Sequence, residues 1–220
     1  MSRFIVFFSL LCAAASAGAA RNILVFGDSL SAGYGLRTGE AWPVLLAGRV
    51  REKAPEYAVA NASISGETTA GGRTRLPAAL RQHKPQVLIL ALGANDGLRG
   101  LPVDSMRDNL RAMIREARAG GAAVLLVGIE LPPNYGPDYT GKFRDAFAEL
   151  AREEKTAFVP FLLDGFGDKR ELFQADTIHP TAAAQPLILD NVWPALEPLL
   201  RRSGAGAGKP SKPAAAAPPR

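Results

Sequence analysis

The sequence has very few of the residues that form disulfides and transition-metal sites. Its 220 residues include one cysteine, Cys12, and two histidines, His83 and His179. A single cysteine excludes an intrachain disulfide and a zinc site built from several cysteine ligands. Two histidines are too few for a histidine-rich metal site, and the chain has no Asp-x-Asp-x-Asp loop of the calcium-binding type. We therefore expect no bound metal, and the alternative is calcium or magnesium held by carboxylates alone.

An excess of charge of one sign is also missing from the body of the chain. The formal net charge is +5, with 26 lysines and arginines against 21 aspartates and glutamates. Six of the basic residues lie near the two ends, where no acidic residue occurs: Arg3, Arg201, Arg202, Lys209, Lys212 and Arg220. Residues 21–200 therefore hold 20 basic and 21 acidic groups. A neutral body argues against a basic nucleic-acid-binding face, so we expect no nucleic-acid partner.

The first 19 residues have the pattern of a signal peptide. Arg3 precedes an apolar stretch, 4–15, and Ala17 and Ala19 supply the small residues of a cleavage site before Ala20. The apolar stretch is short for a membrane span. We expect a periplasmic or secreted protein with no stable membrane insertion after processing. The alternatives are an uncleaved N-terminal anchor and a lipoprotein with Cys12 as the lipidated residue.

The last 18 residues, 203–220, contain no large apolar side chain and are rich in Gly, Ala, Pro and Lys. Such a segment cannot offset the entropy lost on ordering, so it is predicted to be disordered. It would serve either as a solubilising tail or as a flexible basic tether to an anionic surface. Residues 20–202 have the length of one domain, which we expect to be a monomer.

This central part alternates short apolar runs with helix-length segments. The apolar runs predicted as strands are 23–26, 57–61, 87–92, 123–129 and 157–159. The predicted helices are 42–53, 73–83, 102–119, 143–154 and 182–200, the last interrupted by prolines. This alternation is typical of a parallel β-sheet covered by helices on both faces. The predicted fold class is therefore α/β, with ligands bound beyond the carboxyl ends of the strands.

The first apolar run ends in Gly27-Asp28-Ser29-Leu30. A serine at a tight strand-to-helix turn is exposed in the way that a nucleophile requires. The segment is neither a Gly-x-Ser-x-Gly elbow nor a phosphate-binding glycine loop. The alternative interpretation is a plain Asp/Ser helix cap.

Two further residues follow the second and third runs. Gly66 could present an unobstructed backbone N–H, although an ordinary turn glycine would look the same. Asn95, in Gly93-Ala94-Asn95-Asp96, offers a neutral side-chain donor suited to stabilising an oxyanion.

Asp176 and His179 precede the last predicted helix. Hydrolysis by a serine needs a base of near-neutral pKa and a carboxylate that orients it, and a three-residue spacing allows both in one turn of chain. His83 precedes the third strand and would lie at the opposite edge of the sheet. It is interpreted as a surface histidine near a helix end.

These four motifs, in this order, resemble the GDSL or SGNH hydrolase family. Ser29, Gly66, Asn95 and His179 match the residues after which the family is named, and Asp176 matches its acidic partner. The surrounding motifs are similar to those of the bacterial periplasmic arylesterase, acyl-CoA thioesterase and lysophospholipase group. The resemblance covers residues 22–200 and leaves out the tail.

The resemblance implies a three-layer α/β/α domain with a five-stranded parallel sheet in flavodoxin-like order. It also implies a serine esterase that cleaves small-molecule or lipid acyl esters or thioesters without a cofactor. Ser29, His179 and Asp176 would form the catalytic triad, and Ser29, Gly66 and Asn95 the oxyanion hole. The alternatives are a carbohydrate or peptidoglycan O-acetylesterase and a non-catalytic flavodoxin-like binding domain.

Overall fold

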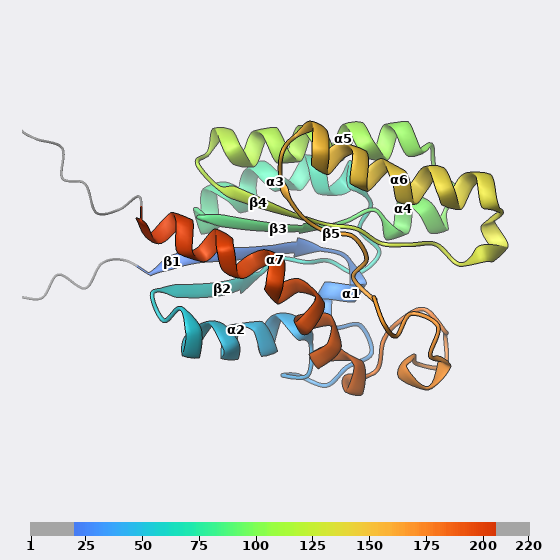
Figure 1. Ribbon diagram of the computed structural model, residues 1–220, viewed down its shortest axis with the longest axis horizontal. Coiled ribbons are helices and arrows are strands. Elements are labelled where there is room, and N and C mark those ends of the chain that lie inside the picture. The colour runs from blue at the N-terminus through green and yellow to red at the C-terminus, as the bar shows by residue number, and fades with distance from the viewer. Residues whose placement is uncertain (1–19, 206–220) are drawn as a thin grey trace, which may run out of the picture.

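The computed structural model describes residues 20–205, and its centre is one parallel sheet (Figure 1). The strands are β1 (Arg21–Gly27), β2 (Tyr57–Asn61), β3 (Val87–Ala91), β4 (Ala123–Val127) and β5 (Ala157–Val159). They pair in the order β2-β1-β3-β4-β5, and every pairing is parallel. The predicted signal peptide, residues 1–19, and residues 206–220 of the predicted tail lie outside the described residues.

Helices cover both faces of this sheet. They are α1 (Ser29–Ala32), α2 (Trp42–Lys53), α3 (Thr69–His83), α4 (Ala94–Leu98), α5 (Val103–Ala119), α6 (Pro137–Glu153) and α7 (Gln185–Ala205). Short 3₁₀ turns occur at Pro133–Tyr135, Arg170–Leu172 and Ala182–Ala184. Figure 1 shows α3, α5 and α6 on one face and α2 and α7 on the other. The predicted three-layer α/β/α fold with five parallel strands is confirmed.

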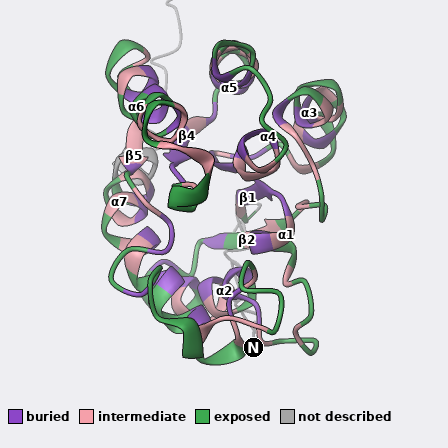
Figure 2. Cartoon of the chain, turned by 90° about the vertical axis from the view of Figure 1, so that its right-hand side faces the viewer, coloured by how far each residue is buried: buried purple, intermediate pink, exposed green. Residues whose placement is uncertain are grey.

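The core lies between the helices and the sheet. All five residues of β3 are buried, and Ile23 to Phe26 of β1 have no exposed surface. A strand covered on both faces must be apolar at every position, which explains the continuous apolar runs in the sequence. In Figure 2 the inner sides of the helices are buried, whereas their outer sides are exposed, and the edge strands β2 and β5 are only partly buried.

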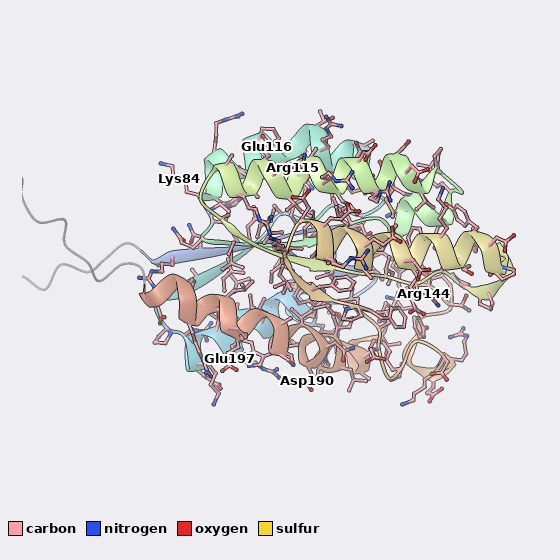
Figure 3. All side chains as sticks on the ribbon, turned by 45° about the horizontal axis from the view of Figure 1, so that its top comes forward. Lys84, Arg115, Glu116, Arg144, Asp190 and Glu197 are labelled. Atoms are coloured by element: carbon pink, nitrogen blue, oxygen red, sulfur yellow. The ribbon has the colours of Figure 1, made fainter. Side chains whose placement is uncertain are left out.

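Ion pairs join neighbouring helices on each outer face. Arg115 of α5, labelled in Figure 3, pairs with Glu154 at the end of α6, with a nitrogen–oxygen distance of 2.7 Å. On the opposite face, Asp190 of α7 pairs with Arg49 of α2 at 2.7 Å. Exposed pairs of this kind contribute about 0 to 1 kcal/mol each, so burial of the core provides most of the stability.

Most predicted elements are present, and the differences have local causes. Helix α3 begins four residues before the predicted start, because the Thr68 side chain caps it by accepting from the N–H of Gly71. The prediction that prolines interrupt the last helix is wrong. Helix α7 continues through Pro194 and Pro198, and its buried residues anchor it on both sides of these prolines: Ile188, Leu189, Val192, Leu196 and Leu200.

Candidate active site

The predicted site residues lie at one edge of the sheet. All five strands are parallel, so the loops that follow them meet at the carboxyl edge, which faces the viewer in Figure 2. Ser29 follows β1, Gly66 follows β2 and Asn95 follows β3. The fold thus brings together segments that are far apart in the sequence.

Ser29 is the first residue of α1, at a tight turn after β1. The Asp28 side chain caps this helix, because its Oδ1 accepts a hydrogen bond of 3.1 Å from the N–H of Leu30. The turn requires a glycine before it. A Cβ on Gly27 would approach the carbonyl oxygen of Ala91 and the Oγ of Ser31 to 2.8 Å each. The absence of a side chain at Gly27 allows the start of α1 to lie close to the end of β3.

The Ser29 hydroxyl, the His179 ring and the Asp176 carboxylate form a continuous hydrogen-bonded series. His179 Nε2 lies 2.9 Å from Ser29 Oγ, although the two residues are 150 positions apart in the sequence. His179 Nδ1 lies 2.7 Å from Asp176 Oδ2. A carboxylate can only accept at this position, so the ring carries its hydrogen on Nδ1. Nε2 is then free to accept from the serine hydroxyl.

Asp176 is held by the turn that it begins. Its Oδ1 accepts the backbone N–H groups of Ile178 and His179, both at 3.0 Å, while Thr177 adopts a left-handed φ of 62°. The hydrogen bond from the backbone N–H of His179, together with that from its ring, lowers the pKa of Asp176 to about 2. The carboxylate is therefore ionised throughout the neutral range.

Gly66 lies on a braced loop between β2 and α3. The N–H of Ile64 donates to the carbonyl of Gly27 at 3.0 Å, which ties the loop to the end of β1. The Arg75 side chain donates to the carbonyl of Ala62 at 2.7 Å and pairs with Glu67 at 2.9 Å. Gly66 itself has a φ of 80°, a conformation that side-chain-bearing residues rarely adopt.

Asn95 lies beside the Gly66 loop. Its Nδ2 donates to the carbonyl of Glu67 at 3.1 Å, and this bond uses one of its two amide hydrogens. The neighbouring Asp96 is buried and accepts from the N–H and the hydroxyl of Thr69 at 2.8 and 2.5 Å. These bonds join α4 to the start of α3. The sequence placed Asp96 next to Asn95 but did not predict its bonds to Thr69.

Asp28 is a buried acid directly next to Ser29. Only 2% of its surface is exposed, and burial raises its pKa to about 7. The nearby Asp96 acts in the same direction. The Asp28 carboxyl is therefore mostly protonated below neutral pH, in contrast to Asp176.

Sequence reasoning missed two residues beside His179. The Tyr34 ring lies 4.4 Å from the imidazole, measured between centroids. The Gln174 side chain links the segment of Tyr34 to the segment of His179. Tyr34 lies just beyond the Gly27-Asp28-Ser29-Leu30 motif, whereas Gln174 has no recognisable pattern.

The described residues contain neither a candidate metal site nor a helix that could span a membrane. Residues 20–205 contain no group of three or more His, Cys, Asp or Glu side chains that could hold a metal. No helix in this range is long and apolar enough to cross a membrane.

His83 ends α3, at the opposite edge from Ser29, and its carbonyl accepts from Asn22 Nδ2 at 2.7 Å.

Comparison with known proteins identifies the family. The model of the GDSL-like Lipase/Acylhydrolase family matches residues 25–186. Esterase TesA of Pseudomonas aeruginosa is 52% identical over 182 residues, covering 83% of this chain and 90% of the relative. Thioesterase 1/protease 1/lysophospholipase L1 of Escherichia coli (strain K12) is 41% identical over 184 residues, covering 84% and 87%.

A solved structure agrees with these sequence relatives. Psychrotrophic esterase EstA from Pseudoalteromonas sp., in a structure inhibited by monoethylphosphonate, matches with a TM-score of 0.78 and 39% identity, covering 82% of this chain and 99% of the other. The predicted resemblance is therefore confirmed, and the chain belongs to the GDSL-like lipase/acylhydrolase family, the SGNH hydrolases.

Proposed function

We propose that this protein is a serine esterase that hydrolyses acyl esters or thioesters through an acyl-enzyme. The observation that carries the proposal is the series Asp176–His179–Ser29, with contacts of 2.7 and 2.9 Å. The names of the relatives, an esterase and a thioesterase/lysophospholipase, support the ester and thioester substrate class. Small-molecule or lipid acyl esters are the proposed substrates.

In the first half-reaction, Ser29 Oγ attacks the acyl carbonyl carbon while His179 Nε2 takes the hydroxyl proton. The carbonyl π pair moves to oxygen and forms the oxyanion. As the intermediate collapses, the bond to the leaving alcohol or thiol breaks, and His179 returns the proton to the leaving atom. Asp176 stabilises the imidazolium throughout, because its carboxylate stays ionised.

In the second half-reaction, water attacks the acyl-enzyme. His179 takes a proton from the water, and the acyl–Oγ bond breaks. The proton then returns to Ser29 Oγ and the carboxylic acid leaves. No electrons are transferred in either step, so the proposed mechanism needs no redox cofactor.

Three donors are proposed to hold the oxyanion: the N–H groups of Ser29 and Gly66 and the Asn95 amide. Asn95 has one amide hydrogen left after its bond to Glu67, and the N–H of Gly66 has no acceptor among the described residues. Unpaired donors at a ligand-binding edge are suited to a charge that develops only in the transition state.

The test uses a p-nitrophenyl phosphonate, which reacts with an activated serine and releases p-nitrophenolate as the Oγ–phosphorus bond forms. We expect one equivalent of p-nitrophenolate and one labelled site, Ser29. Ser29→Ala should lose both labelling and hydrolysis of p-nitrophenyl butyrate. Ser105→Ala, an exposed serine of α5, should retain them. Labelling elsewhere, or activity in Ser29→Ala, would refute the proposal.

We also propose that the protein is exported and that its mature N-terminus is Ala20. The proposal rests on the basic, apolar and small-residue order of residues 1–19. N-terminal sequencing of protein recovered from a periplasmic or secreted fraction tests it. Met1 retained on soluble cytoplasmic protein would contradict it.

A further inference from the structure

The Gln174 side chain connects the turn that carries the serine with the turn that carries the histidine. Its Nε2 donates to the carbonyl of Tyr34 at 2.8 Å, across 140 positions of sequence, and to the carbonyl of Pro180 at 3.2 Å. Its backbone N–H donates to the carbonyl of His179 at 2.8 Å. One residue therefore fixes both the segment after Ser29 and the segment around His179.

Tyr34 continues this connection to both reacting side chains. Its N–H donates to the carbonyl of Ser29 at 3.3 Å. Its ring packs against the His179 imidazole with a centroid distance of 4.4 Å and a tilt of 38°. Aromatic pairs at this separation are attractive, and an aromatic ring near an imidazolium also stabilises the positive charge.

The loop backbone is shaped for the Gln174 amide. Gly35 has a φ of 72°, and a Cβ at this position would overlap Gln174 Oε1. A glycine therefore meets two demands here, the left-handed backbone and the space for the amide. The close fit keeps the Tyr34 carbonyl in reach of Nε2.

We propose that Gln174 is a positioning residue for the hydrolysis, acting through Tyr34 to hold the His179 imidazole in register with Ser29. The inference rests on the proposed triad and adds a residue to which neither the family motifs nor the comparisons assign a role. General-base transfer requires Nε2 and Oγ within hydrogen-bonding distance. The amide fixes the two turns relative to each other.

The experiment compares Gln174→Met with a matched control. Methionine keeps the length of the side chain and removes both donors. Asn191 makes a similar double clamp, because its Nδ2 donates to the carbonyls of Leu162 and Asp164, both at 3.0 Å. Asn191→Leu removes that clamp, whose bonds involve none of the proposed catalytic residues. Both variants are purified as the full chain, and their Tm, kcat, KM and phosphonate labelling rates are measured.

We expect both variants to lose some Tm, but only Gln174→Met to lose catalysis. Displacing a reacting group by about 1 Å can cost up to roughly a hundredfold in rate, so we expect a tenfold or greater fall in kcat and in labelling rate. KM should stay within twofold, because the Gln174 amide nitrogen donates to two backbone carbonyls of the protein itself. Equal kcat for Gln174→Met, Asn191→Leu and the unaltered protein would overturn the inference.

A double variant tests the route through Tyr34. If Gln174 acts by holding Tyr34, Tyr34→Leu should reproduce the loss, and adding Gln174→Met should lower kcat little further. Multiplied losses in the double variant would show that the two residues act separately and would overturn this route. Failure of the proposed function would look different, because the unaltered protein would then resist phosphonate labelling.

Discussion

Asp176 binds both the backbone and the ring of His179. Its Oδ1 accepts the backbone N–H of His179 at 3.0 Å, and its Oδ2 faces the ring Nδ1 at 2.7 Å. The turn that begins at Asp176 thus fixes the position of the carboxylate and the tautomer of the ring together. The three-residue spacing in the sequence is the length of chain that this double contact needs.

Asp176→Asn should therefore leave the turn intact and reverse the ring tautomer. Two backbone N–H groups require an acceptor at the Oδ1 position, so the new NH₂ group would face Nδ1. The ring hydrogen would move to Nε2, which could then no longer take the Ser29 proton. We expect kcat for p-nitrophenyl butyrate to fall by about a hundredfold or more.

The control is Asp145→Asn, at an exposed aspartate of α6 whose ion pair with Arg144 lies on the surface. It should leave kcat unchanged. Circular dichroism should show both variants folded. A kcat within twofold of normal in Asp176→Asn would leave a Ser29–His179 dyad and reduce Asp176 to a structural residue.

Asp28 and Asp176 affect the pH dependence of stability in opposite directions, because the pKa of Asp28 is raised and that of Asp176 is lowered. Because burial raises its pKa from 3.8 to about 7, the folded protein binds this proton more tightly than the unfolded chain. Its stabilising effect is complete below pH 4 and is lost as the pH rises to 7. Asp28→Asn keeps an acceptor for the Leu30 N–H and removes the titration.

We expect Asp28→Asn to gain stability relative to the unaltered protein as the pH rises from 4 to 7, by up to about 4 kcal/mol. Urea unfolding at half-unit pH steps measures the difference between the two proteins, in which the other titrating groups cancel. Parallel stability curves over this interval would show that Asp28 has an ordinary pKa.

Asn95→Ala tests the side-chain donor of the proposed oxyanion hole. Loss of one such donor costs about a hundredfold to a thousandfold in kcat. Asn22→Ala is the matched control, because it removes a bond of 2.7 Å from an asparagine amide to a carbonyl at the opposite edge of the sheet. It should lower Tm without lowering kcat. If the two variants lose kcat equally, Asn95 acts only through the stability of the fold.

The sequence was sufficient to predict the fold because burial leaves a simple pattern. The sheet interior admits only apolar residues, so β3 could be recognised in the predicted run 87–92, one residue longer than the observed strand, and the observed bounds of α2 and β2 equal the predicted ones. Helix α4 was missed because five residues are too few to show helical periodicity. The continuous α7 was missed because the packing of its buried residues outweighs the low helix propensity of proline.

The candidate site likewise contains residues that the sequence could predict and residues that only the structure shows. Ser29, Gly66, Asn95, Asp176 and His179 stand in local motifs, so the sequence could nominate them, and their catalytic roles remain predictions. Gln174 and Tyr34 lie 140 positions apart and meet only through a side chain and a carbonyl. A contact of this kind leaves no periodicity or spacing in a single sequence, and only the folded chain shows it.

Gly66→Ala separates backbone strain from catalysis at the second proposed oxyanion donor. Gly66 has a φ of 80°, and its Cβ position is open, with Arg99 Nη2 the nearest atom at 3.9 Å. An alanine would not collide but would favour a negative φ, at a cost of roughly 1 to 2 kcal/mol in the observed conformation. The loop can relieve this strain by rotating its backbone, which would move the Gly66 N–H out of the orientation proposed for binding the oxyanion.

Gly121→Ala is the matched control for this last prediction. Gly121 has a φ of 86°, nothing lies within 4 Å of its Cβ position, and it precedes β4 at the edge opposite Ser29. Both variants should lose similar stability in urea, because both carry the same backbone strain. Only Gly66→Ala should lose kcat, by about tenfold to a hundredfold, with KM nearly unchanged, because an oxyanion donor acts on the transition state. If Gly66→Ala keeps its kcat while losing the same stability as Gly121→Ala, its N–H does not bind the oxyanion, and the Ser29 N–H and the Asn95 amide would remain as the proposed donors.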